Sequence, residues 1–198
     1  MSSEQLVEQK KALRKHMRQA RRSLSDKEQK DHAVQVARCA LTLAEFKEAT
    51  KIALYIANDG ELALDALLDT AVEQGKICYL PKITGNDMSF HLYSGSDSLV
   101  VGAYDIMEPV PHAEAIDPQQ LDLVFVPLVA FDHKGDRLGM GKGFYDRCFE
   151  FTREEGNEKP ILMGIAHDVQ QADVLPCEPW DVRLQAIVTE SGIQRHAR

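Results

Sequence analysis

The sequence predicts an α/β fold: an open, mostly parallel, Rossmann-like sheet covered by helices, in a single domain with N-terminal helices. Short apolar segments typical of buried strands alternate with amphipathic helical segments from residue 51 onward. The 198 residues suffice for one sizeable core but not for two large ones. We therefore expect one domain over 1–198, with a helical part at 1–46 and an α/β body at 51–198.

Two helices are expected before the first strand. Residues 4–22 contain no Gly or Pro and are rich in strong helix formers. A second helix is expected after Ser25, which is placed to cap its first turn, and Glu28 three residues later completes a capping box. The apolar face of this helix continues up to about Phe46.

The first strands form a predicted β-α-β unit. KIALYIA (51–57) is a short apolar run, and KICYLP (76–81) is a second one. Between them, LALDALLDTAVEQG (62–75) is an amphipathic helix that closes on a glycine. Such units place their two strands side by side and parallel. Further strands are expected at 88–93, 121–127, 160–166 and 182–190, and a helix over 143–155.

Composition excludes several classes of protein. The net charge of −8 argues against a general nucleic-acid binder. No apolar run approaches the roughly 20 residues that span a bilayer. The N-terminus lacks a signal-peptide pattern, so a cytoplasmic protein with no membrane partner is expected. The four cysteines are widely spaced without a CxxC pair, which is typical of free thiols in a reducing compartment.

Charge is unevenly distributed along the chain. Residues 1–22 hold seven basic and two acidic side chains, so this segment carries +5 and the remainder −13. Lys10 and Arg14 lie four residues apart and share one face of the predicted helix. Three interpretations stay open: a solvated basic face, contact with phosphate across a crevice, or contact with RNA. The last lacks interleaved aromatic residues for base stacking.

Three polar segments follow predicted strands, where parallel sheets bind ligands. They are NDGE (58–61), VAFDHKGDRLGMGKG (129–143) and AHD (166–168). We expect all three to converge on one crevice.

The segment RLGMGKGFYDR (137–147) has three alternating glycines before a predicted helix. Such glycines let backbone N–H groups approach an anion, and the helix N-terminus adds partial positive charge. Arg137 and Lys142 are placed to neutralise phosphate oxygens, and Asp146 to hold a magnesium ion that bridges them. The segment is neither a Walker A motif nor a Rossmann fingerprint, so a tight turn with a solvated lysine is the alternative.

Other polar residues each allow two interpretations. Glu61 either hydrogen-bonds a planar heterocycle or is an acid favoured at a helix N-terminus. Asp181 is either a second metal ligand or a turn or cap carboxylate. His167 is interpreted as a loop histidine at a strand end rather than a catalyst. Because no nucleophile-with-base arrangement stands out in the sequence, a covalent acyl mechanism is not indicated.

The segment VPLVAFDHKGDRLGMGKGFYDR resembles the signature of the 5-formyltetrahydrofolate cyclo-ligases, also called 5,10-methenyltetrahydrofolate synthetases. KKALRKHMRQARRSLS resembles the opening helix of that family, and ALYIANDGELALDALLDTAVEQGKICYLPKI its strand, acidic turn, helix and strand. YDIMEPV and PWDVRLQAIVTESG resemble two further elements. The resemblance covers nearly the whole chain, in order.

The resemblance implies an ATP-dependent ligase of one-carbon metabolism that cyclises 5-formyltetrahydrofolate to 5,10-methenyltetrahydrofolate and releases ADP and phosphate. ATP would phosphorylate the formyl oxygen, and the nitrogen at position 10 of the folate would attack the activated carbon. ATP and 5-formyltetrahydrofolate, with or without a polyglutamate tail, are the implied partners. Mg²⁺ is the implied cofactor, and a monomer is expected.

The resemblance also carries roles onto individual residues. Lys142, Arg137 and Tyr145 match catalytic positions, and Asp146 and Asp181 match the magnesium positions. Glu61 matches the carboxylate that holds the pterin, with Ile56 beside it. The other folate-binding positions are Met140, Gly141, Lys142, Gly143 and Phe144. The implied ATP-binding set is Lys10, Arg14, Arg137, Leu138, Gly139, Met140, Gly141, Lys142, Gly143, Phe144 and Tyr145.

Some positions are less firmly matched. Glu108 is expected near the site. Phe144 stands where the family commonly has Tyr, Trp180 where it often has His, and Asp105 where it usually has Gly. Two other functions remain as alternatives: a non-catalytic nucleotide or folate binder, and an RNA-associated protein that uses the basic helix.

Overall fold

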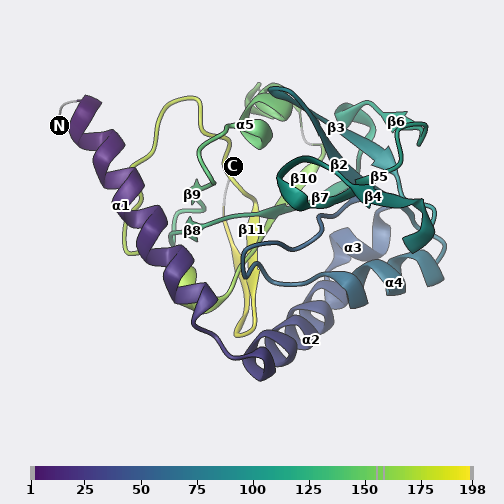
Figure 1. The fold of residues 1–198 in the computed structure, drawn as a ribbon, viewed down its shortest axis with the longest axis horizontal. Helices are drawn as coiled ribbons and strands as arrows, with labels where there is room; N and C mark the ends of the chain where they lie inside the picture. The colour runs from purple at the N-terminus through teal and green to yellow at the C-terminus, as the bar shows by residue number, and fades with distance from the viewer. Residues whose placement is uncertain (1–2, 155, 158, 197–198) are drawn as a thin grey trace.

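The computed structural model describes residues 3–154, 156–157 and 159–196, and its centre is an eight-stranded mixed sheet (Figure 1). The strand order is β12-β11-β10-β7-β1-β2-β3-β6. The five strands from β11 to β2 are mutually parallel, and β12, β3 and β6 pair with their neighbours in antiparallel fashion. The bounds are β1 Lys51–Ala53, β2 Ile77–Thr84, β3 Asp87–Leu92, β6 Ala115–Ile116, β7 Leu123–Pro127, β10 Ile161–Ile165, β11 Ala186–Thr189 and β12 Gly192–Arg195.

The remaining elements surround this sheet. The helices are α1 Ser3–Arg22, α2 Asp26–Thr42, α3 Ala44–Glu48, α4 Asp65–Glu73 and α5 Phe144–Cys148. Short 3-10 turns are η1 Ser96–Ser98, η2 Ala103–Asp105, η3 Pro118–Gln120, η4 Glu150–Arg153 and η5 Asp168–Gln170. Two small two-stranded sheets pair β4 Leu99–Val101 with β5 Met107–Pro109, and β8 Ala130–Phe131 with β9 Arg137–Leu138. The predicted α/β fold with a mostly parallel sheet and N-terminal helices is confirmed.

The core lies on both faces of the sheet because successive strand residues point to opposite sides. On β7, Phe125 joins the core that α2, α3 and α4 cover. Its neighbours Val124 and Val126 join the opposite core, which Phe149 and the segment after α5 cover. The strand is therefore apolar throughout, as a central parallel strand buried on both faces must be.

The predicted β-α-β unit is confirmed, although its elements are shorter than expected. Strands β1 and β2 are parallel neighbours, with Ile52 opposite Cys78. The apolar run at 51–57 leaves the ladder after Ala53, since the chain turns there to line a cavity. The helix expected over 62–75 begins only at Asp65.

The N-terminal helices differ from the expectation at one point. The capping box of Ser25 and Glu28 is present at the start of α2. The single helix expected up to Phe46 breaks at Leu43, whose backbone is extended at φ −61° and ψ 134°. This break lets α3 turn so that Phe46 is only 1% exposed. Tertiary burial thus overrides continuous helix propensity.

The last predicted strand and the helix after the glycine segment are also shorter than expected. The strand expected over 182–190 pairs only from Ala186, and the helix expected over 143–155 is a five-residue α5 followed by η4. Glu155 at the end of that prediction lies outside the described residues.

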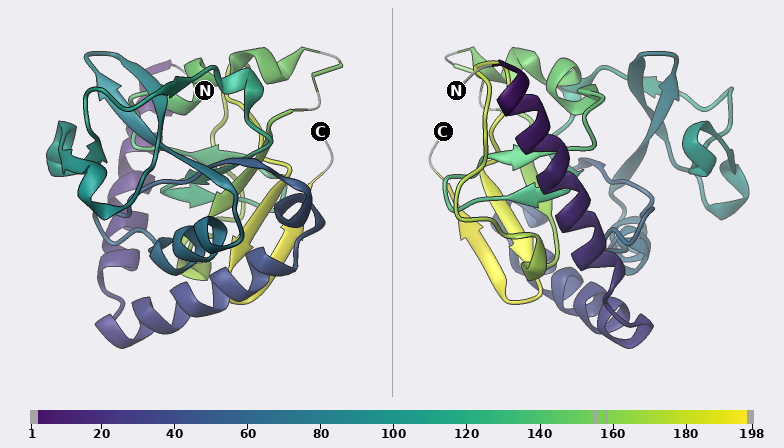
Figure 2. Two further views of the ribbon diagram at one scale, coloured as in Figure 1. Left: turned by 90° about the vertical axis from the view of Figure 1, so that its right-hand side faces the viewer. Right: turned by 60° about the vertical axis from the view of Figure 1, so that its left-hand side comes forward.

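Helix α1 lies against the edge of the body beside the β8–β9 hairpin (Figures 1 and 2). Met17 is 6% exposed and packs in a small core with Val129 and Leu138. The prediction of free cysteines is confirmed, since all four thiols are unbridged. None of the helices within the described ranges has the length and apolarity that a membrane span requires.

Candidate functional site

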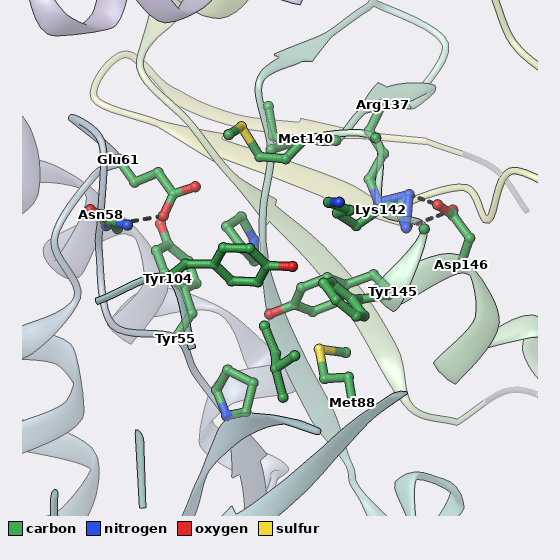
Figure 3. Close-up of a pocket in the computed structure, with 18 of the residues that line it drawn as sticks. Tyr55, Asn58, Glu61, Met88, Tyr104, Arg137, Met140, Lys142, Tyr145 and Asp146 are labelled. Atoms are coloured by element: carbon green, nitrogen blue, oxygen red, sulfur yellow. Dashed lines mark hydrogen bonds and ion pairs between the residues drawn. The ribbon is translucent and has the colours of Figure 1, made fainter. Parts of the chain in front are cut away.

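A cavity of about 530 Å³ opens beyond the carboxyl ends of β1 and β7 (Figure 3). Strand β1 pairs with β2 on one side and with β7 on the other. The chain adds β2 and β3 on the first side and β7, β10 and β11 on the second, so the direction in which successive strands are added reverses between β1 and β7. Open α/β sheets bind ligands at such a reversal. All residues of the implied catalytic, ATP-binding, folate-binding and magnesium sets, from Lys10 to Asp181, line this cavity.

The glycine segment and α1 meet at the cavity wall. Arg14 donates from Nε to the Gly139 carbonyl over 2.8 Å. Gly141 has φ +93°, and a Cβ atom there would lie 3.2 Å from the Arg14 guanidinium carbon. Only glycine combines this backbone conformation with so close an approach. The basic face of α1 is therefore docked on the loop rather than solvated.

Lys10 and Lys142 bring ammonium groups to the same wall. Lys10 Nζ lies 3.6 Å from Asp181 Oδ2 and 3.9 Å from Glu178 Oε1. Lys142 is exposed and, among the described residues, forms no ion pair. Figure 3 shows its amino group directed toward the cavity. An uncompensated ammonium facing a cavity is a natural partner for an anionic ligand.

Arg137 and Asp146 are paired with each other. The Asp146 Oδ1 atom accepts from Arg137 Nη2 over 2.8 Å and from Nη1 over 3.0 Å, and also from the Val182 backbone N–H. The Arg137 side chain is 5% exposed, and its Nη1 also donates to the Val182 carbonyl. In this structure the guanidinium therefore holds Asp146 instead of pointing at a free phosphate position.

Two carboxylate oxygens at the cavity remain available to a cation. Asp181 uses Oδ2 to accept from the Glu178 backbone N–H over 2.9 Å, so it serves as a turn carboxylate. Over the described residues, Asp146 Oδ2 and Asp181 Oδ1 accept no hydrogen bond. Mg²⁺ in nucleotide sites is typically held by one or two carboxylates together with phosphate oxygens and water. The donor set therefore fits Mg²⁺.

Glu61 lies at the opposite end of the cavity and closes the turn 58–61. Its Oε2 accepts from the Asn58 backbone N–H over 3.1 Å. Since α4 begins only at Asp65, the alternative that Glu61 is an acid at a helix N-terminus is wrong. Burial raises the pKa of Glu61, an effect that the nearby Arg21 guanidinium opposes.

Arg21 is a functional residue that the sequence analysis missed. Its side chain is fully buried and donates to the Asp59 carbonyl and carboxylate and to the Leu128 carbonyl. Its Nη2 also lies 3.6 Å from Glu61 Oε1. One guanidinium thus joins α1, the acidic turn and the end of β7. Its sequence signal is a position on the same face of the basic helix, seven residues after Arg14 and eleven after Lys10.

Two tyrosines face each other across the cavity (Figure 3). The Tyr145 hydroxyl is buried and has no hydrogen-bond partner among the described residues, and burial raises its pKa, so it stays neutral. Tyr104, which sequence reasoning missed, is 55% exposed with φ +58°. It is followed by Asp105 at φ +59°, a left-handed conformation that favours Gly. Here Asp105 retains the turn without that glycine.

Glu108 and Trp180 also line the cavity. Glu108 is 5% exposed, and its Oε1 accepts from the backbone N–H groups of Ile83 and Ala103. It therefore ties strand β2 to the turn that carries Tyr104.

One sequence expectation is wrong: the segment 166–168 does not join the cavity. His167 is fully buried, and its Nδ1 lies 2.9 Å from His32 Nδ1. The segment continues into η5, which packs beneath α1, and Gln170 Nε2 donates to the Leu128 and Val129 carbonyls. These contacts cover the carboxyl end of β10, so only two of the three polar segments converge. The interpretation of His167 as a loop histidine agrees with this position.

Comparison with known proteins identifies the family. The model of the 5-formyltetrahydrofolate cyclo-ligase family matches residues 6–190. The chain belongs to the 5-formyltetrahydrofolate cyclo-ligase family. Among curated cyclo-ligases, that of Haemophilus influenzae is 36% identical over 182 residues, which covers 90% of this chain and 96% of the relative. The cyclo-ligase of Escherichia coli is 35% identical over 181 residues, which covers 89% of this chain and 98% of the relative.

Solved structures of cyclo-ligases, titled 5,10-methenyltetrahydrofolate synthetases, share the fold. The Aquifex aeolicus protein superposes with a TM-score of 0.83 at 36% identity, covering 96% of this chain and 93% of its own. The Mycoplasma pneumoniae protein superposes with a TM-score of 0.73 at 26% identity, and the match covers 91% of this chain and 98% of that protein. The predictions of the family and of a cyclo-ligase enzyme are confirmed, and membership disfavours the RNA-associated alternative.

Proposed function

We propose that this protein uses ATP to cyclise 5-formyltetrahydrofolate to 5,10-methenyltetrahydrofolate in the cavity between β1 and β7. One observation carries the proposal: a cation-lined glycine loop and the partly buried Glu61 carboxylate lie at opposite ends of the same cavity. That arrangement suits a reaction in which a phosphoryl donor and a heterocycle must meet.

The triphosphate of ATP is assigned to the glycine-loop end. Lys142 would neutralise the transferring phosphoryl group, and Lys10 and Arg14 would contact the outer phosphates from α1. Backbone N–H groups of the loop, which runs into α5, would add hydrogen bonds. Three cations on this wall, with Lys142 exposed toward the cavity, support this assignment, because phosphoryl transfer depends on positioning and charge neutralisation more than on covalent catalysis.

Asp146 and Asp181 are proposed to hold Mg²⁺ through the two carboxylate oxygens that the protein leaves free. Bound there, Mg²⁺ would supply charge neutralisation to the phosphate oxygens. The role we assign to Arg137 follows from its contacts: it orients Asp146 through two hydrogen bonds to Oδ1. Lys10, which lies 3.6 Å from Asp181, would hold the second carboxylate and face the phosphates.

The folate ring is assigned to the other end. Glu61 presents its carboxylate where paired N–H donors of a pterin would meet it, and Ile56 provides an apolar neighbour. The exposed ring of Tyr104 offers a face for a planar heterocycle. Met140 and Phe144 from the glycine loop would complete the wall between the two substrates.

The chemistry then requires no protein nucleophile. The formyl oxygen attacks the terminal phosphorus of ATP, and an O–P bond forms as the bond to ADP breaks. The nitrogen at position 10 next attacks the formyl carbon and releases its proton to solvent, and phosphate leaves with that oxygen as the new C–N bond closes the ring. The neutral Tyr145 hydroxyl, which has no partner among the described residues, would donate a hydrogen bond to an oxygen of the transferring group. Phe144 lacks a hydroxyl, so Tyr145 alone supplies one at this point of the loop.

An absorbance assay tests the proposal. Purified protein, 5-formyltetrahydrofolate and Mg²⁺ should produce the ultraviolet band of methenyltetrahydrofolate only when ATP is added. Equal amounts of ADP and phosphate should accumulate. A flat trace from protein that binds ATP in calorimetry would overturn the proposal in favour of a non-catalytic nucleotide or folate binder.

A further inference from the structure

A second cluster of metal-binding side chains lies outside the cavity. It consists of His32 on α2, His167 two residues after β10, and Glu190 directly after β11. None of the three lines the cavity, and the proposed function uses none of them. The sheet order brings them together, because β10 and β11 are parallel neighbours whose carboxyl ends meet below α2.

The spacing of the three side chains suits a metal ion. His32 Nδ1 lies 2.9 Å from His167 Nδ1 and 3.2 Å from Glu190 Oε1, and the three ligand atoms all lie within 4.8 Å of one another. Tetrahedral Zn²⁺, with bonds of about 2.0–2.2 Å, holds adjacent nitrogen and oxygen ligands about 3.3 Å apart. Small side-chain adjustments would therefore place one ion at bonding distance from all three atoms.

The cluster holds more acceptors than protons at its centre, although the Glu190 carboxylate also accepts from the Asp168 backbone N–H. Both His167 Nδ1 and the Glu190 carboxylate are close to the same atom, His32 Nδ1, which carries at most one proton. His167 Nε2 is buried without a hydrogen bond of normal geometry, although the Gly60 backbone favours a proton on this ring. A proton on Nε2 leaves the Nδ1 lone pair directed at His32. A cation would accept all three converging lone pairs together.

The environment also favours a neutral ligand and access for an ion. Burial lowers the pKa of His167 to about 4, with His32 and Arg21 acting in the same direction. The His32 and Glu190 side chains are 18% and 13% exposed, so the cluster is open on one side to an entering ion and to water.

We propose that His32, His167 and Glu190 form a binding site for one divalent transition-metal ion, Zn²⁺ by the chemistry of its ligands. Two imidazoles and one carboxylate are a usual zinc ligand set, and water would occupy the fourth position. The ion would tie α2 to the ends of β10 and β11. Its role would be to stabilise the fold, so the site is independent of the cyclisation reaction.

Zinc binding to the full-length, metal-free protein tests the proposal. The protein is titrated with Zn²⁺ against a chromophoric zinc chelator, in excess Mg²⁺ to occupy the carboxylates of the cavity. We expect one Zn²⁺ per chain. At a free Zn²⁺ concentration 100-fold above Kd, the melting temperature should rise by about 5–10 °C. Co²⁺ in place of Zn²⁺ should give the visible absorption bands of a four-coordinate site.

Two variants locate the ion, and a third variant serves as a matched control. His32→Ala and Glu190→Gln change partly exposed side chains, and each should weaken zinc binding at least about 100-fold and abolish the rise in melting temperature. His112→Ala removes an exposed histidine far from the cluster, and this variant should bind Zn²⁺ as tightly as the unaltered protein does. Circular dichroism checks that each variant is folded. No stoichiometric binding, or equal binding by folded Glu190→Gln, would overturn the proposal.

Discussion

At the scale of single residues, Lys142 separates a phosphate role from a structural one. Its side chain is exposed, and within the described part of the chain it forms no ion pair. Lys142→Ala should lower kcat about 30- to 1000-fold, because one charged contact in a transition state is worth about 2–4 kcal/mol. Its melting temperature should stay close to that of the unaltered protein. Lys134→Ala, an exposed lysine of the neighbouring β8–β9 turn, is the control and should keep full activity.

The Tyr145 hydroxyl is buried but unpartnered in the described residues, which predicts opposite effects on stability and activity. Removing a buried polar group without a partner costs the folded protein nothing, so Tyr145→Phe should melt at the same or a higher temperature. Loss of a hydrogen bond to a charged oxygen should lower kcat/KM about 10- to 100-fold. Thermal melts and steady-state kinetics measure the two effects. A lower melting temperature with unchanged kinetics would contradict the assigned role.

Glu61 predicts a pH dependence of stability. Burial raises its folded-state pKa above the unfolded value, with Arg21, the Asn58 N–H and Arg18 opposing. Protonation of Glu61 therefore stabilises the folded protein. This stabilisation is complete below the pKa of Glu61 in the unfolded state and is lost as the pH rises through its pKa in the folded state. The Glu61→Gln variant has no titrating group at this position and does not suffer this loss. The difference in melting temperature, variant minus unaltered protein, should therefore be more positive at pH 8 than at pH 4.5. Melting both proteins across this range checks the sign.

At the scale of elements, Arg21 joins α1 to the turn 58–61 and to the end of β7. Arg21→Lys offers one ammonium in place of a planar fork and leaves buried acceptors without donors. We expect a loss of about 3–5 kcal/mol in the free energy of unfolding, measured by urea titration. Arg22→Lys is the matched control, because Arg22 pairs with the same Asp59 from a side chain that is 56% exposed. Equal losses for the two variants would contradict the assigned role of Arg21.

At the scale of the whole molecule, the cavity joins parts that are distant in the sequence, namely α1, the acidic turn and the glycine loop. A ligand that bridges them should stabilise the whole fold. Mg²⁺ with ATP at 100-fold excess over Kd should raise the melting temperature by about 5–10 °C, and EDTA should remove most of this rise. Arg14→Ala should reduce it, since Arg14 holds the loop to α1. An undiminished rise in this variant would contradict the assignment of phosphates to that wall.

Two expectations about the whole molecule stay predictions: a monomer, and a single domain over 1–198. Light scattering in solution measures the first directly, with an expected mass of about 22.2 kDa.

Local features of the chain were readable from the sequence because local physics produces them. The capping box at Ser25 depends on residues three apart, and the strand character of β7 depends on five consecutive apolar side chains. The alternating glycines likewise report a local backbone requirement, which Gly141 shows with its φ of +93°. Such signals located the α/β fold and the loop that lines the cavity.

Only the tertiary structure decided which distant side chains meet. Arg137 turns to Asp146, Arg21 is buried against the acidic turn, and the segment at His167 is covered by α1 instead of opening into the cavity. The place of His167 follows from the order of the strands, since β10 and β11 end on one side of the reversal point and β1 and β7 flank it. Strand order is set by the packing of the whole sheet. No local pattern encodes it, which is why the sequence identified the chemistry but not its partners.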